Sequence, residues 1–338
     1  MAEKIIEVKG LRTSFFTDEG EIPAVDHVNF YIKEGEILGV VGESGCGKSV
    51  TSLSIMGLVP SPPGKIVDGE IVFNGENIAK FSEKKMRQIR GNDIAMIFQE
   101  PMTSLNPLLT IGNQMIEGIK IHMKWDKKKS RARAIEVMKR VGLPRAEELM
   151  DEYPHQLSGG MRQRVMIAMA MACNPKLLIA DEPTTALDVT IQSQILKLMK
   201  KLNAELNTAI MLITHDLGVV AQICERVVVM YAGKIVEEGA VSSIFKNPKH
   251  PYTKGLLKSV PDIRNKNERL YSIPGNVPRP GSIKNGCRFA ERCEFAFDRC
   301  FSDTPELYEV DDKGHRVRCF LQSKEEESNH DTAFTSSS

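Results

Sequence analysis

The chain has 338 residues, 26% of them charged, and a formal net charge of +1. This length allows one large domain with an appendage or two modest domains, and the near-neutral charge excludes a global field that would recruit nucleic acid or acidic lipid. The apolar runs are of strand length, far short of the ~20 residues that span a bilayer, and the N-terminus has no signal-peptide core. We therefore expect a soluble cytosolic protein, in which the seven cysteines are poor candidates for structural disulfides.

The first forty residues alternate as strands do, in IIEVKGL, AVDHVNFYI and EILGVV, with a hairpin turn expected at 17–21. A strand pair is expected at 69–78, with Asn74-Gly75 as its turn. From about residue 83 to 150 the sequence becomes helical and charged, and KKKSRARAIEVMKRVGL is the clearest amphipathic helix. Strands return at LLIAD, AIMLITHD and RVVVMYAG, separated by helical stretches. Such alternation predicts a mostly parallel α/β sheet.

The segment GESGCGKS matches the phosphate-binding pattern G-x-x-x-x-G-K-[ST] between a strand-like and a helix-like stretch, which is the context the motif needs. Its glycines let backbone N–H groups point at phosphate oxygens, Lys48 would reach the β- and γ-phosphates, and the Ser49 hydroxyl would hold Mg²⁺. The alternative is a glycine-rich turn with a bystander lysine. The candidate nucleotide-binding residues are Gly42, Ser44, Gly45, Gly47, Lys48 and Ser49. The loop occurs once, so the chain carries a single nucleotide cassette.

A second motif, KLLIADEPTTALD, is an apolar strand that ends in two adjacent acids. The strand would place Asp181 beside the phosphate loop, where it can hold the Mg²⁺ shell. Glu182 would then polarise the water that attacks the γ-phosphate. The alternative is a pair of solvated acids at a strand end.

A third motif, LSGGMRQRV, precedes a long helix. Ser158 has N-cap chemistry, and Gly159 and Gly160 leave backbone N–H groups open to an anion. Alone, the stretch would be read as an ordinary capped helix.

Together these three motifs resemble the ATP-binding cassette (ABC) ATPases. In that resemblance Gln99 looks like the glutamine loop, a ligand of Mg²⁺ or water and a contact to the transmembrane partner. Asp188 looks like part of the D-loop, and His215 like the switch histidine at the γ-phosphate, although a lone histidine after a strand is usually structural. Phe15 or Phe16 would stack on adenine, and a core phenylalanine is the alternative.

The resemblance covers roughly residues 5–245 and implies a P-loop NTPase (RecA-like) α/β core with an antiparallel β subdomain and an α-helical subdomain at about 83–165. The nucleotide-binding domain would span 1–250. One cassette implies pairing with a second ABC ATPase subunit, identical or related, around two ATP molecules. It also implies two separate transmembrane permease subunits at the cytoplasmic face of the cell membrane and, indirectly, an extracytoplasmic substrate-binding protein.

Three segments resemble the branch that powers dipeptide, oligopeptide and nickel importers: FQEPMTSLNPLLTIG, KNPKHPYTKGLLKSVP and IPGNVP. We therefore expect ATP hydrolysis coupled to uptake of di- or oligopeptides. Nickel or another small cargo stays open. The rival is a soluble ABC ATPase outside transport, but such proteins typically carry two cassettes or a long coiled-coil insertion.

Residues 251–322 are expected to form an irregular extension, and the composition of 323–338 is that of a disordered tail. Within the extension four cysteines are spaced C-x5-C-x6-C-x18-C, which suggests a metal site rather than disulfides. Zinc sites usually show tighter pairs. Nearby arginines would offset the negative charge of an iron–sulfur centre, and phenylalanines would exclude solvent. The four cysteines are Cys287, Cys293, Cys300 and Cys319, and the four arginines are Arg288, Arg292, Arg299 and Arg318.

Similar C-terminal segments in the peptide-importer branch bind a [4Fe–4S] cluster, so the resemblance implies one here. Zinc and four unligated thiols remain the alternatives. His315 could replace one ligand, although a supporting or surface role is the favoured interpretation.

Overall fold

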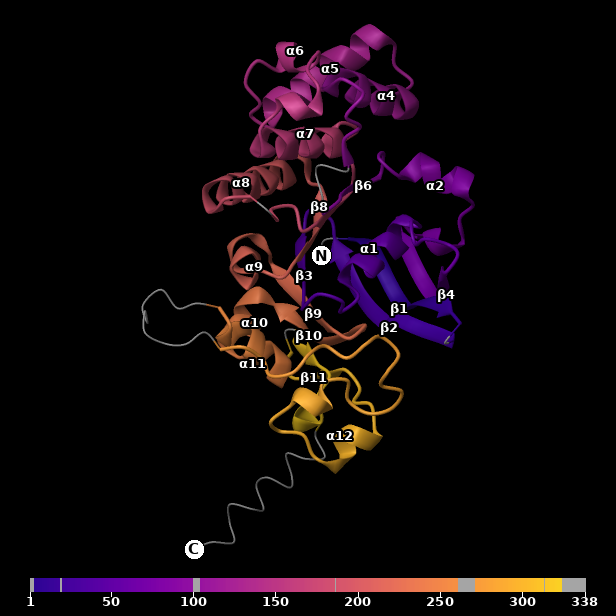
Figure 1. The fold of residues 1–338 in the computed structure, drawn as a ribbon, viewed down its shortest axis with the longest axis vertical. Coiled ribbons are helices and arrows are strands. Elements are labelled where there is room, and N and C mark those ends of the chain that lie inside the picture. Colours follow the sequence, from indigo (N-terminus) through magenta and orange to yellow (C-terminus); the bar gives the residue numbers. More distant parts are fainter. Residues whose placement is uncertain are drawn as a thin grey trace, which may run out of the picture.

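The computed structural model describes residues 3–18, 20–99, 104–185, 187–260, 271–312 and 314–323. Its centre is an eight-stranded sheet with the order β11-β12-β10-β9-β3-β8-β7-β6 (Figure 1). Five neighbouring strands are parallel, as predicted: β3 (Ile37–Val41), β6 (Ile94–Ile97), β7 (Leu177–Asp181), β8 (Ala209–Thr214) and β9 (Arg226–Tyr231). Three antiparallel strands continue the sheet on the β9 side: β10 (Lys234–Ala240), β12 (Arg316–Val317) and β11 (Tyr308–Glu309).

A second, antiparallel sheet has the order β2-β1-β4-β5. Its strands are β1 (Lys4–Thr17), β2 (Gly20–Lys33), β4 (Gly64–Phe73) and β5 (Glu76–Asn77). The β1–β2 hairpin closes at the pair Thr17 and Gly20, where the sequence predicted a turn. Asn74 and Gly75 have φ angles of 48° and 81°, because a type I′ hairpin turn requires positive φ at both central residues.

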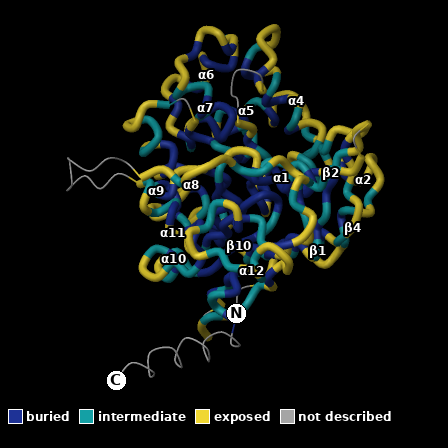
Figure 2. The backbone as a smooth tube through the Cα atoms, turned by 60° about the horizontal axis from the view of Figure 1, so that its bottom comes forward, coloured by how far each residue is buried: buried dark blue, intermediate teal, exposed yellow. Residues whose placement is uncertain are grey.

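The parallel strands divide their side chains between two apolar cores, because successive residues of a strand point to opposite faces. In β7, Leu177 and Ile179 join the cluster that includes the antiparallel sheet, whereas Leu178 and Ala180 join the cluster built with the helices. Every residue of β3, β7 and β8 is buried, and Figure 2 draws buried stretches of the backbone in dark blue. Their near-continuous apolar sequence follows from this double burial.

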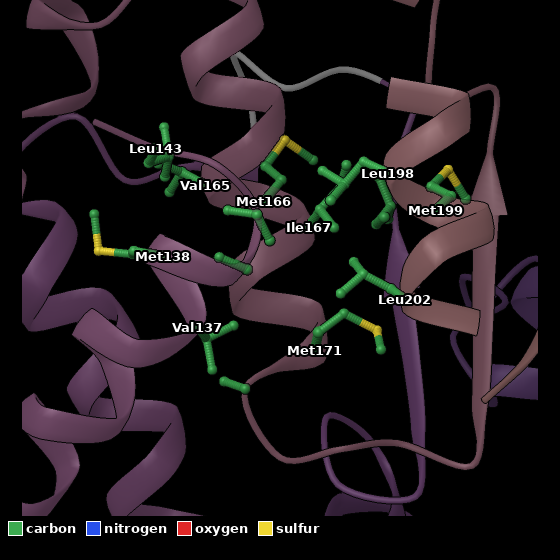
Figure 3. Packing of buried hydrophobic residues seen from close by; sticks show 14 of the residues in the cluster. Val137, Met138, Leu143, Val165, Met166, Ile167, Met171, Leu198, Met199 and Leu202 are labelled. Carbon is green, nitrogen blue, oxygen red and sulfur yellow. The ribbon is translucent and has the colours of Figure 1, made fainter. Parts of the chain in front are cut away.

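The helical core covers one face of the sheet. Figure 3 shows side chains of α5, α7 and α8 interdigitating, with Ile167 between Val165 and the leucines of α8. Methionines contribute much of this packing, since their flexible side chains fill irregular gaps. The helices of this region are α4 (Ile111–Met123), α5 (Lys127–Arg140), α6 (Ala146–Leu149), α7 (Gly159–Met171) and α8 (Val189–Leu206).

The expected helical segment at about 83–165 contains a strand of the core sheet. Helix α2 (Glu83–Ile89) is followed by β6, which pairs with β7, and the helical region proper begins only at α4. Four apolar residues, IAMI, between charged helices give no clear period, so this strand was missed.

The C-terminal extension is joined to the core rather than separate from it, because β12 pairs with β10 at Glu237 and Glu238. Of the predicted tail at 323–338, only Ser323 is described, and it is buried; residues 324–338 and Ala186 of the D-loop lie outside the described residues. Within the described ranges, no helix combines the length and apolar character that a bilayer span requires. The remaining helices are α1 (Lys48–Met56), α9 (Leu217–Ile223), α10 (Val241–Lys246), α11 (Pro251–Lys258) and α12 (Asp298–Ser302).

Candidate active site

The predicted phosphate loop connects β3 to α1 and lines a cleft of about 330 Å³. Helix α1 begins with Gly47 (φ 101°) at its N-cap and has no side-chain cap, so its first backbone N–H groups can serve an anion. A Cβ atom at Gly42 would lie 2.3 Å from the carbonyl oxygen of Met230, so only glycine fits there. Ser44, Gly45, Gly47, Lys48 and Ser49 line the cleft, as the motif predicted.

Lys48 and Ser49 supply the two kinds of group that the site needs, an ammonium for phosphate and a hydroxyl for a metal ion. The buried Lys48 ammonium donates to the carbonyl oxygens of Gly42 (2.7 Å) and Glu43 (3.0 Å). Ser49 hydrogen-bonds to Asp181 at the end of β7, but burial has the larger effect and raises the pKa of Asp181. The Oδ1 atom of Asp181 is buried without a hydrogen-bond partner. An orphaned carboxylate oxygen beside a serine hydroxyl fits Mg²⁺, which prefers oxygen ligands.

Glu182 joins the side chains that follow three neighbouring strands. Its Oε2 accepts hydrogen bonds from Gln99 Nε2 and Thr185 Oγ1, both at 3.0 Å, and its Oε1 lies 3.2 Å from His215 Nδ1. Burial would raise the pKa of Glu182, but the hydrogen bonds from His215 and Thr185 outweigh burial and lower it. The carboxylate is therefore ionised at neutral pH, the state that a proton acceptor needs.

Part of the cleft lining is apolar. Phe15, Ile22 and Ala24 belong to this part, whereas Phe16 is 48% exposed and does not. Of the two phenylalanines, Phe15 is thus the one in position to meet a base. Pro280 of the C-terminal extension also lines the cleft, a contact that no motif predicted.

The signature residues lie elsewhere. Ser158 caps α7 by accepting from the Met161 N–H at 3.3 Å, as predicted, and Gly160 lies against Ile191 of α8. None of Ser158, Gly159 and Gly160 is among the described residues that line the cleft. Asp188 caps α8 through the Ile191 N–H at 2.9 Å. Both loops therefore sit at helix N-termini outside this cleft.

The four cysteines of the extension line one narrow cavity together with apolar side chains that include Phe289, Phe295 and Phe320. Burial raises the pKa of Cys287 to about 11 and of Cys319 to about 12, and neighbouring thiols add to the shift. As the side chains stand, no three Cys, His, Asp or Glu groups of the described residues are arranged to hold an ion. Four thiols on one apolar cavity nevertheless fit the donor chemistry of a thiolate-held centre.

Three of the four arginines beside these cysteines have partners on the cassette, and the expected compensation of cluster charge stays a prediction. Arg292 binds Glu43 of the phosphate loop, and Arg288 binds Asp26. Arg318 donates to the carbonyl oxygens of Ile235 and Pro305, whereas Arg299 lies over the Phe320 ring.

Of two histidines in this region, His250 and not His315 lines the cysteine cavity. His315 is buried on Glu237 (2.7 Å) and is not among the residues lining the cysteine cavity. His250, which sequence reasoning missed, lines that cavity with its Nε2 buried and unpartnered. Its place next to Pro251 at the start of α11 was the only available signal.

Known proteins support the same picture. The family described as "ABC transporter" matches residues 25–185, and "Oligopeptide/dipeptide transporter, C-terminal region" matches residues 236–300. The oligopeptide transport ATP-binding protein AppD of Bacillus subtilis (strain 168) is 56% identical over 95% of this chain and 98% of its own length. The dipeptide transport ATP-binding protein DppD of Escherichia coli (strain K12) is 49% identical over 93% of this chain and 96% of its own length.

Among solved structures, the ATP-binding cassette MJ0796, a dimer in a post-hydrolysis state with ADP and phosphate, has a TM-score of 0.63 and 32% identity. That similarity covers 70% of this chain and 98% of MJ0796. CbiO1 from Clostridium perfringens has a TM-score of 0.62 and 31% identity, and that similarity covers 72% of this chain and 92% of CbiO1. The chain therefore belongs to the ABC transporter ATP-binding proteins, in the oligopeptide/dipeptide group that carries this C-terminal region.

Proposed function

We propose that this ABC ATPase powers the uptake of di- or oligopeptides. The observation that carries the proposal is the single cleft that unites Lys48, Ser49, Gln99 and Glu182, with Asp181 beside it. Relatives named for oligopeptide and dipeptide transport, together with the matching C-terminal region, support the cargo.

In the proposed mechanism Glu182 accepts the proton of the attacking water, and Gln99 and His215 orient that water and the γ-phosphate. Lys48 exchanges its two loop carbonyls for phosphate oxygens when ATP enters. Ser49, Asp181 and Gln99 would hold Mg²⁺, which supplies charge neutralisation at the phosphates when bound. The orphaned Asp181 oxygen supports that assignment.

We further propose that Ser158, Gly159 and Gly160 bind the ATP of a second ABC subunit, with Asp188 at the same dimer interface. The position of both loops at helix N-termini outside their own cleft supports a partner in trans. Two permease subunits would place the pair at the cytoplasmic face of the membrane, and an extracytoplasmic binding protein would deliver the cargo.

For the cysteine cavity we propose a [4Fe–4S] cluster held by Cys287, Cys293, Cys300 and Cys319. The convergence of the four thiols on an apolar cavity supports it. Cys300→Ser should remove most of the iron and its visible absorption, and Cys173→Ser, a buried cysteine of the cassette, should remove neither. Full iron retention in Cys300→Ser would take Cys300 out of the ligand set.

The ATPase mechanism is tested by Glu182→Gln, with exposed Glu147→Gln as the matched control. We expect hydrolysis to fall about 100-fold or more while MgATP still binds, because a general base contributes on that scale. Near-normal turnover of Glu182→Gln would refute the proton-acceptor role.

The cargo is tested in a host that lacks the gene, by uptake of labelled dipeptides and oligopeptides beside nickel. Peptide uptake should be lost, restored by the wild type and not restored by Glu182→Gln. Loss of nickel uptake alone would keep the ATPase role and overturn the peptide assignment.

A further inference from the structure

The phosphate loop is tied to the C-terminal extension by one arginine whose five N–H donors all have acceptors. Arg292 Nη1 and Nη2 donate to the two carboxylate oxygens of Glu43 at 2.8 and 3.1 Å. Nη1 also reaches Tyr231 Oη at 3.3 Å. Nη2 and Nε bind the carbonyl oxygens of Ile273 (3.3 Å) and Pro274 (2.8 Å). The Arg292 side chain is only 5% exposed and that of Glu43 is 32% exposed, so this is a planar, two-pronged ion pair with a buried arginine and a partly exposed carboxylate.

Glu43 is the second residue of the phosphate loop, and three of its groups are held at once. Besides the carboxylate, its N–H donates to Tyr252 Oη at 2.9 Å, and its carbonyl oxygen accepts from Lys48 Nζ at 3.0 Å. Tyr252, Tyr231 and Phe289 pack as an aromatic cluster, with ring centroids 4.7 to 5.4 Å apart. That cluster joins the underside of the loop to the cysteine cavity, which Phe289 also lines.

We propose that Arg292 is a positioning residue of the nucleotide site, through which the extension sets the affinity of the phosphate loop. Three glycines give this loop unusual conformational freedom, and ordering it opposes ligand binding. A loop already fixed at Glu43 loses less freedom when phosphate arrives, so binding is tighter. Arg292 is not among the described residues that line the cleft; it acts through Glu43. The proposal rests on ATP binding by the chain and not on the cargo or on the cluster.

The test is a titration of the purified full-length protein with MgADP and MgATP. Arg292→Met and Glu43→Gln should each weaken binding about tenfold, and the double variant should be no weaker than the worse single variant, since both remove one contact. Arg292→Lys should fall between, because lysine keeps the charge but not the fork. The control is Arg299→Met, another arginine that precedes a cysteine, and it should stay within twofold of the wild type. In hydrolysis, KM should rise while kcat stays within twofold.

Single-variant affinities within twofold of the wild type, or effects that multiply in the double variant, would overturn the proposal and leave Arg292 as a fastener of the extension. Glu43→Gln leaves the arginine in place, so it decides the matter even where Arg292→Met melts early. A change in kcat alone would equally contradict a role in loop positioning.

Discussion

The helical region of α4 to α7 and the C-terminal extension lie at opposite ends of the molecule in Figure 1, and they are attached to the core sheet differently. The helical region is attached by a large apolar cluster that continues into the sheet. The extension is attached by a two-residue strand, by a smaller apolar cluster to which Tyr252 and Phe289 belong, and by ion pairs from Arg288 and Arg292. Apolar packing holds the helical region in place without depending on one particular contact. The ion pairs, in contrast, connect the extension to two specific residues, Asp26 and Glu43 of the phosphate loop. Substitutions in the two regions should therefore have different consequences for the nucleotide site.

The largest expected loss of stability is on the apolar side. Ile167 in α7 is fully buried, so Ile167→Ala should lower the free energy of unfolding by about 3 kcal/mol, through lost transfer energy and the cavity left behind. Denaturant titration measures the change. The MgADP affinity of the folded protein should stay unchanged, and a weakened affinity would erase the contrast between the regions.

Removing an ionic contact of the extension should lower the free energy of unfolding by a smaller amount, and that loss should depend on pH. Burial would raise the pKa of Asp26, but hydrogen bonds from Lys234 and His27 and the charges of Lys234 and Arg288 outweigh it and lower the pKa to about 2. This carboxylate therefore contributes stability above pH 4, and that contribution is lost as pH falls through 2. Asp26→Asn should lower the free energy of unfolding at pH 7 by about 2 kcal/mol, a difference that vanishes near pH 2. Unfolding curves at both pH values measure this difference, and a difference of equal size at the two pH values would contradict the assignment.

A smaller effect is expected at a helix cap of the helical region. Asp126 Oδ1 accepts from the Lys129 N–H at 2.7 Å at the start of α5. Asp126→Ala should lower stability by about 1 kcal/mol, the usual contribution of such a cap, whereas Asp126→Ser should restore most of it. Equal losses in both variants would mean that the cap hydrogen bond is not the stabilising contact.

The smallest effect is expected at an exposed ion pair. Arg131 and Asp151 lie 3.1 Å apart, with side chains 39% and 75% exposed. Asp151→Asn should change stability by less than about 0.5 kcal/mol, because solvent screens such pairs. A loss as large as that of Asp26→Asn would show that burial does not separate the two ionic contacts.

The residues of the site that could be predicted are those that belong to short sequence motifs. Lys48 and Glu182 line one cleft and Asp181 hydrogen-bonds to Ser49 beside it, because strand ends and helix starts of a parallel sheet converge at one edge. The Glu43–Arg292 pair joins residues 249 positions apart, and no local pattern encodes such a contact. The same limit applies to the fold. The sequence pattern predicts the long alternating strands, but it does not predict β12, which has only two residues.

The antiparallel pairing of β12 with β10 also bears on synthesis. β10 leaves the ribosome well before residues 316 and 317, so one edge of the central sheet stays open while the extension is still being made. Open edges invite pairing with other chains. Glu237 and Glu238 stand where β12 will pair, and two acids at an unpaired edge discourage such association. A nascent chain stalled before Arg316 should thus depend on these two charges for its solubility.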